Sequence, residues 1–158
     1  MTAATELTRI ERSITVRAPR SRVWRALSTA AEFAKWFSVE IREGEVFQPG
    51  RRIELTSRHE KADGIEFSMV IETVDPEKLI SWRWHPGMPD SSVDYDREPM
   101  TLVEFKLEDI PGGTKVTVIE TGFDKLSLNR RASVFKDNNE GWEIQMGALA
   151  RHLESASA

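Results

Sequence analysis

The feature that most constrains the fold is a period-two alternation of apolar and polar residues, which recurs in several segments between residues 39 and 123. Alternation of this kind indicates strands with one buried face and one solvent face. Turn signals separate the segments, including residues 75–78 (DPEK) and Pro111-Gly112, which has the order of a type II turn. Short turns join antiparallel neighbours. The sequence therefore predicts an antiparallel meander whose apolar face needs a cover.

Pairing across the predicted hairpins keeps this apolar face continuous from strand to strand. The hairpins bend at residues 59–63, at residues 75–78 and at Pro111-Gly112. The expected pairs are Ile53 with Met69, Leu55 with Phe67, Ile71 with Trp82, Met69 with Trp84, Leu107 with Val116, Phe105 with Val118 and, on the solvent face, Glu108 with Lys115.

The cover is the C-terminal segment, where the spacing predicts one amphipathic helix from about residue 131 to 153. Its apolar residues recur at intervals of three, four and seven, and no proline interrupts them. At 1.5 Å per residue the helix is about 35 Å long, enough to cross six or seven strands about 4.8 Å apart. Asn138, Asn139 and Gly141 weaken the helix signal, so a kink or a start near Glu140 is left open.

The N-terminal segment predicts one strand followed by two short helices. Residues 10–18 alternate with a period of two, and Pro19 ends the strand. Residues 19–27 have helical spacing, and Thr29 and Glu32 have the spacing of a capping box before the second helix. The predicted fold class is α+β, a curved antiparallel sheet of about six or seven strands wrapped around a long C-terminal helix. The length of 158 residues fits a single domain over 1–158, with an ordered core of about 8–154.

The amino-acid composition excludes several classes of chemistry and of partner for this chain. The absence of cysteine excludes disulfides, cysteine-based metal sites and thiol nucleophiles. A net charge of −4 offers no basic field for nucleic acid or anionic lipid, so neither partner is expected. No stretch approaches the roughly 18 apolar residues of a membrane span, and the N-terminus lacks a signal-peptide core, so we expect a cytoplasmic protein. Phosphate-binding and dinucleotide fingerprints are absent, and no cofactor is expected.

Aromatic residues are the strongest indication of function. The chain has five tryptophans and seven phenylalanines against one tyrosine, and indoles either fill a bulky core or line an apolar cavity. Both readings stay open, because the meander and the helix bring these residues to the same concave face. The expected ligand-pocket residues are Trp36, Phe37, Phe47, Phe67, Met69, Trp82, Trp84, Phe105, Val118, Glu120, Trp142 and Met146.

Three polar residues are weak candidates for catalysis. Glu120 falls opposite Val103 on the apolar face, where a carboxylate needs a partner or a raised pKa; the alternative is a strand end in water or paired with an arginine. Alternation turns His85 outward unless the chain bends at the following proline. Tyr95 lies in the loop 86–99, which is long enough for a lid. The histidines and the acidic loop lack metal-ligand spacing, so no metal site is expected.

Residues distributed along nearly the whole chain resemble the START-like (SRPBCC) helix-grip superfamily, and within it the family related to the activator of the heat-shock-protein-90 ATPase. Three further pairs, His85-Pro86, Asp94-Tyr95 and Arg130-Arg131, are similar to those of a bacterial subgroup of unassigned function. The matching residues are Ala18-Pro19, Val23-Trp24, Leu27, Phe33, Trp36, Phe37, Gly50, Leu79 to Trp84, Thr101 to Phe105, Gly113-Thr114, Glu120 to Phe123 and Gly141-Trp142.

The resemblance implies the helix-grip fold and a deep apolar cavity between the sheet and the long helix. It implies no reaction, because relatives include lipid carriers, plant hormone binders, polyketide cyclases and co-chaperone domains. The leading hypothesis is a non-enzymatic protein that binds a small hydrophobic or aromatic molecule. The alternatives are a cyclase, dehydratase or hydrolase that uses Glu120, His85 or Tyr95, and a co-regulator of a chaperone ATPase. A homodimer is also left open, since helix-grip domains with exposed strands often pair.

Overall fold

The computed structural model describes residues 8–60, 62–87 and 92–156. Within these residues the strands form one seven-stranded sheet in the order β1-β7-β6-β5-β4-β3-β2, and every neighbouring pair is antiparallel. The elements are β1 (Arg9–Val16), α2 (Arg20–Ser28), α3 (Ala30–Phe37), β2 (Val39–Ile41), β3 (Arg52–Ser57), β4 (Glu66–Asp75), β5 (Leu79–Trp84), β6 (Thr101–Ile110), β7 (Gly113–Thr121), η1 (Phe123–Lys125) and α4 (Leu128–Ala156).

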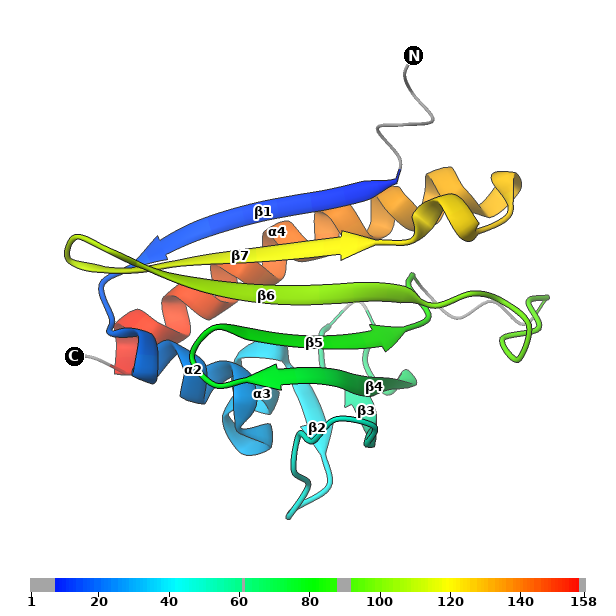
Figure 1. Ribbon diagram of the computed structural model, residues 1–158. Helices are drawn as coiled ribbons and strands as arrows, with labels where there is room; N and C mark the ends of the chain where they lie inside the picture. The colour runs from blue at the N-terminus through cyan, green and yellow to red at the C-terminus, as the bar shows by residue number, and fades with distance from the viewer. Residues whose placement is uncertain (1–7, 61, 88–91, 157–158) are drawn as a thin grey trace.

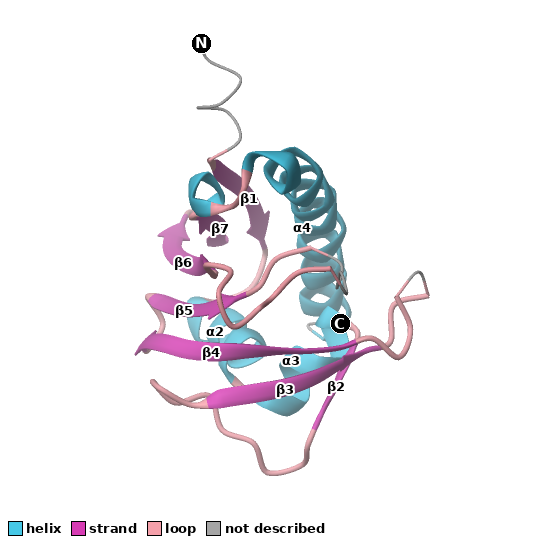
Figure 2. Cartoon of the chain, turned by 90° about the vertical axis from the view of Figure 1, so that its right-hand side faces the viewer, coloured by secondary structure: helices cyan, strands magenta, loops and turns pink. Residues whose placement is uncertain are grey.

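The helices lie on the concave face of the sheet. Figure 1 shows α4 running along the sheet behind β1 and β7, with α2 and α3 near its C-terminal end. Figure 2 shows the sheet curling around these helices from β1 to β2. The α+β helix-grip architecture predicted from the sequence is confirmed, with seven strands and two short helices after the first strand.

The predicted strand registers are also confirmed. Val70 pairs with Arg83, which continues the same register toward Met69 and Trp84. A register shift between Ile71 and Thr73 was not expected from the sequence. The observed pairs include Ile53 with Met69, Leu55 with Phe67, Ile71 with Trp82, Leu107 with Val116, Phe105 with Val118, Glu108 with Lys115 and Val103 with Glu120.

Two local predictions were wrong or incomplete. Thr29 precedes α3 but makes no side-chain capping bond, so the capping box is wrong. Glu32 instead forms an ion pair with Arg22 and a hydrogen bond with His152, because both tertiary partners lie within reach. The C-terminal helix is continuous over 29 residues from Leu128, so it does not begin near Glu140. Asn138 lies inside that helix, where its side chain makes tertiary hydrogen bonds that override its low helix propensity.

Aromatic side chains fill the centre of the concave face. Phe33, Trp82 and Phe105 are fully buried there. The ring centroids of Phe33 and Trp82 are 5.7 Å apart in an edge-to-face contact, and those of Trp82 and Phe105 are 5.6 Å apart and stacked. The short helix α3 and the sheet therefore meet in a close-packed core, and a cavity lies to one side of it.

Candidate functional site

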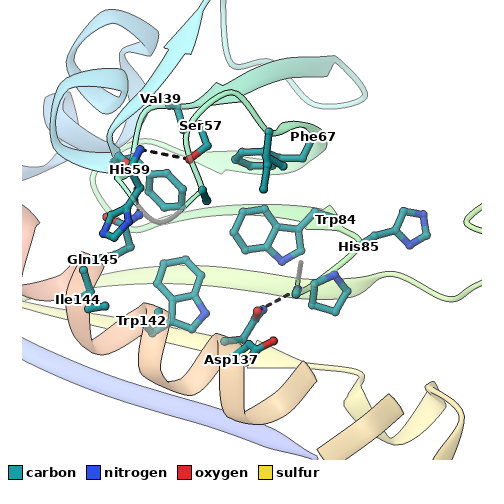
Figure 3. A pocket seen from close by; sticks show the side chains of 17 residues that line it. Val39, Ser57, His59, Phe67, Trp84, His85, Asp137, Trp142, Ile144 and Gln145 are labelled. Atoms are coloured by element: carbon teal, nitrogen blue, oxygen red, sulfur yellow. Dashed lines mark hydrogen bonds between the residues drawn. The ribbon is translucent and has the colours of Figure 1, made fainter. Parts of the chain in front are cut away.

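A cavity of about 260 Å³ lies where α4 passes the ends of β3, β4 and β5 (Figure 3). Side chains from α3 and β2 and from the loop between β3 and β4 complete its wall. Ile144 and Asp137 belong to the lining and are themselves exposed, so the cavity opens to solvent. A mostly apolar wall with a few polar groups is the usual form of a small-molecule site.

Four aromatic rings form the apolar wall of this cavity: Phe37, Phe67, Trp84 and Trp142. The indoles of Trp84 and Trp142 are stacked, with centroids 5.9 Å apart and planes inclined by 27°. Phe37 and Phe67 contact Trp84 at centroid distances of 6.2 and 6.1 Å. Because the rings come from α3, β4, β5 and α4, the cavity forms only when the helices are seated on the sheet.

Glu120, at the end of β7, is the buried polar group behind this wall. Its side chain is fully shielded from solvent, and its two oxygens accept four hydrogen bonds. Oε2 accepts from Trp84 Nε1 at 2.9 Å and from Thr101 Oγ1 at 2.5 Å. Oε1 accepts from Trp142 Nε1 and from Asn138 Nδ2, both at 2.8 Å. A buried carboxylate needs its lone pairs satisfied in this way.

The location of Glu120 settles two sequence-based alternatives. The expectation that it lies in water or pairs with an arginine is wrong, because it is buried and forms no ion pair within the described part of the chain. It does not line the cavity either, since the indoles of Trp84 and Trp142 stand between the carboxylate and the open space. Glu120 is therefore a positioning residue that holds the two indoles at the cavity wall.

Asn138 joins three parts of the site. Its Nδ2 donates to Glu120, and its Oδ1 accepts from the backbone N–H of Gly87 at 3.0 Å. The residue thus connects α4 to β7 and to the segment that follows β5. Asn138 was absent from the residues expected at the site, because in the sequence it stood out only as a weak helix former.

His85 and Tyr95 form a separate pair of rings, with centroids 5.0 Å apart. Figure 3 shows the imidazole of His85 directed away from Trp84 and Trp142, as strand alternation predicted, although the residue belongs to the cavity lining. Burial lowers the pKa of His85, and its Nδ1 has no hydrogen-bond partner among the described residues. Tyr95 does not line the cavity. Residues 88–91 of the same loop lie outside the described residues.

The other expected pocket residues lie in the core and do not line this cavity: Trp36, Phe47, Met69, Trp82, Phe105, Val118 and Met146. The sequence missed several residues that do line it, including Val39, Ser57, His59, Ile144 and Gln145. His59, in the segment where the sequence predicts a hairpin bend, is half-buried at the wall. No local pattern marks these positions, because they meet only through the tertiary packing of α4 against two loops.

A second hollow of about 590 Å³ is larger but has a different character. It lies on β2, β3 and β4 and is lined by charged residues such as Arg42, Arg52, Glu54 and Glu66. Ionised side chains at a surface keep their water, so this hollow is a poor site for an apolar molecule.

In the described part of the chain, no group of three or more His, Asp or Glu side chains is placed to hold a metal ion. No helix among those residues is long and apolar enough to cross a membrane.

Comparison with known proteins identifies the family. The model of the family described as "Activator of Hsp90 ATPase homolog 1-like protein" matches residues 17–154. The chain belongs to this family. The resemblance read from the sequence is thereby confirmed, and the helix-grip fold is the one expected of the family. No curated protein matches the chain.

Solved structures show the same fold at low sequence identity. Protein MLL2253 from Mesorhizobium loti is 19% identical with a TM-score of 0.73, over 93% of this chain and 97% of that chain. The Aha1 dimer from Colwellia psychrerythraea is 20% identical with a TM-score of 0.66, over 92% and 96%. DynU16, a putative protein in the dynemicin biosynthetic locus, is 22% identical with a TM-score of 0.71, over 94% of this chain and 48% of that chain.

Proposed function

We propose that this protein binds a small hydrophobic molecule in the cavity between α4 and the ends of β3, β4 and β5. The observation that carries the proposal is the wall of four aromatic rings around an open space of about 260 Å³. Transfer of apolar surface from water into such a site is favourable by roughly 25 cal/mol per Å². The helix-grip family adds support, because the resemblance implies an apolar cavity in this region of the fold.

The arrangement of polar groups favours binding over catalysis. General acid–base chemistry needs at least two suitable side chains within hydrogen-bond reach of one substrate. Glu120 makes four hydrogen bonds behind the indoles, and Tyr95 does not line the cavity. His85 turns its ring away from the aromatic wall (Figure 3). Glu120 is thus separated from the His85–Tyr95 pair, and of that pair only His85 lines the cavity, so the aromatic wall favours binding.

The test is a titration with N-phenyl-1-naphthylamine, an uncharged probe whose emission rises when it leaves water. We expect saturable binding at one site per chain. Gly141 lies on the cavity wall, and a Cβ built there meets no atom within 4 Å, so Gly141→Leu extends a side chain into the cavity without a backbone clash. We expect this substitution to weaken probe binding at least tenfold.

Gly147→Ala is the matched control, because it also replaces a glycine of α4 but lies outside the cavity lining. Both variants gain helix propensity, which guards against a loss of fold. Equal probe affinity in the wild type and in Gly141→Leu, with both proteins folded by circular dichroism, would show that the probe binds elsewhere. Absence of saturable binding to the wild type would remove the proposal.

A further inference from the structure

The charge of the cavity lining is one-sided. Among the described residues of the lining, Asp137 is the carboxylate, and none of these residues is a lysine or an arginine. Asp137 is exposed and forms no ion pair within the described residues. An anionic ligand, such as a fatty acid, would therefore meet one carboxylate of like charge, and no lysine or arginine among the described residues of this wall.

A second carboxylate lies directly behind the aromatic wall. Glu120 is fully buried and has no cationic partner within the described part of the chain. Trp84 and Trp142 both donate their indole N–H to it. A hydrogen bond to an anion polarises the donor, which leaves more electron density on the indole ring. Electron-rich indole faces attract cations, and they do so more strongly away from water.

Two arginines that act electrostatically on His85 of the cavity lining, Arg130 and Arg52, are paired with carboxylates. Arg130 donates two hydrogen bonds to Glu98, at 2.8 and 3.2 Å, and Arg52 pairs with Glu54 at 3.3 Å. Burial lowers the pKa of His85 and so disfavours the imidazolium form. These groups do not offset the negative character of the aromatic wall.

From this arrangement we propose that the cavity selects organic cations: molecules with an apolar body and a protonated or quaternary amine. The apolar body lies against Trp84, Phe37 and Phe67, and the ammonium group lies between Trp142 and the carboxylate of Asp137. This inference rests on the proposed function, since it names the ligand class of the same cavity. It distinguishes the site from one built for lipid anions, where a cationic side chain would strengthen the hydrogen bonds to the carboxylate.

The experiment uses three probes with the same ring system and different charge: 2-(1-naphthyl)ethylamine, 2-(1-naphthyl)ethanol and 1-naphthylacetate. Each competes with N-phenyl-1-naphthylamine at neutral pH and low salt. We expect the ammonium to bind about five- to tenfold more tightly than the alcohol, on the scale of a partly desolvated cation–π contact. We expect the carboxylate to bind more weakly than the alcohol.

Asp137→Asn is the diagnostic variant, and Glu143→Gln is its control. Glu143 is an exposed acid of α4 outside the cavity lining, so its loss changes the net charge of the protein equally. Asp137→Asn should reduce the affinity for the ammonium about threefold and leave that for the alcohol unchanged. Glu143→Gln should change neither.

The outcomes separate this inference from the proposed function. If N-phenyl-1-naphthylamine binds but the ammonium and the alcohol compete equally, or the carboxylate competes best, selection of cations is refuted and binding of hydrophobic molecules stands. If the ammonium preference is as large in Asp137→Asn as in the wild type, the placement of the ammonium at Asp137 is refuted. If no naphthyl compound binds, both proposals fail.

Discussion

Three tryptophans of this protein allow the contribution of an indole hydrogen bond to the free energy of unfolding to be compared with that of packing. Trp82, Trp84 and Trp142 are all buried, but their indole N–H groups differ in partner. Trp84 and Trp142 donate to Glu120, whereas Trp82 Nε1 has no hydrogen-bond partner among the described residues. Replacement of each by phenylalanine removes a similar apolar volume, and only two of the three replacements leave the buried carboxylate with one donor fewer.

The expected magnitude follows from these partners. A hydrogen bond to a charged group contributes about 1.5–3 kcal/mol, and an unpaired buried donor costs about 1–3 kcal/mol. Trp142→Phe and Trp84→Phe lose such a bond, while Trp82→Phe removes an unpaired donor. We therefore expect the first two variants to be less stable than Trp82→Phe by at least about 2 kcal/mol. For a domain of this length that corresponds to about 4–8 °C in melting temperature.

Urea denaturation followed by far-ultraviolet circular dichroism measures the three stabilities without relying on tryptophan emission. The urea dependence of the free energy of unfolding should be equal in all variants, so that the midpoints report stability alone. If Trp82→Phe is as destabilised as Trp84→Phe and Trp142→Phe, packing dominates at all three positions. The network around Glu120 would then contribute little to the native state.

Two further predictions concern the fold around the site. Burial tends to raise the pKa of Glu32, but hydrogen bonds from His152 and Arg22 outweigh it and lower this pKa below its usual value. A lowered folded-state pKa contributes stability above the unfolded value of about 4.3 and loses it as the pH falls through the folded value. Glu32→Gln should therefore be about 1–2 kcal/mol less stable than the wild type at pH 7, and denaturation at successively lower pH should find this difference shrinking. At Gly113 an added Cβ would lie 1.9 Å from the carbonyl oxygen of Val16, so Gly113→Ala should lower the melting temperature by about 6 °C or more; an unchanged melting temperature would contradict this close approach of β7 to β1.

The fold was predictable because its signals are local and repeat. Alternation placed Glu120 opposite Val103 and Phe105 opposite Val118, and the structure has the same pairs. A shift of one residue in the register would turn the apolar side chains of a strand to the solvent face, so burial of the apolar face itself determines the pairing. The same reasoning identified Glu120 as a carboxylate on the buried face, although not which donors satisfy it.

The cavity was less predictable, because it depends on how far side chains reach across the core. Trp82 and Trp84 occupy the same face of β5, but Trp82 contacts Phe33 and Phe105 in the filled centre, and only Trp84 reaches the open side. The sequence carries no local signal for that difference, since both residues have the same strand pattern. Helix propensity was misleading at Asn138, because a propensity scale does not include the tertiary hydrogen bonds that this side chain makes inside α4.

Glu120 links the stability of this protein to the chemistry of its cavity. By accepting both indole N–H groups, it leaves Trp84 and Trp142 no donor to offer a ligand, so these rings can contribute only their apolar and π surfaces. A ligand that needs hydrogen bonds deep in the site would not find them at the indoles. Discrimination must then come from ring shape and from charge at the opening, where Asp137 lies. The same carboxylate that holds the aromatic wall in place therefore restricts how that wall can recognise a ligand.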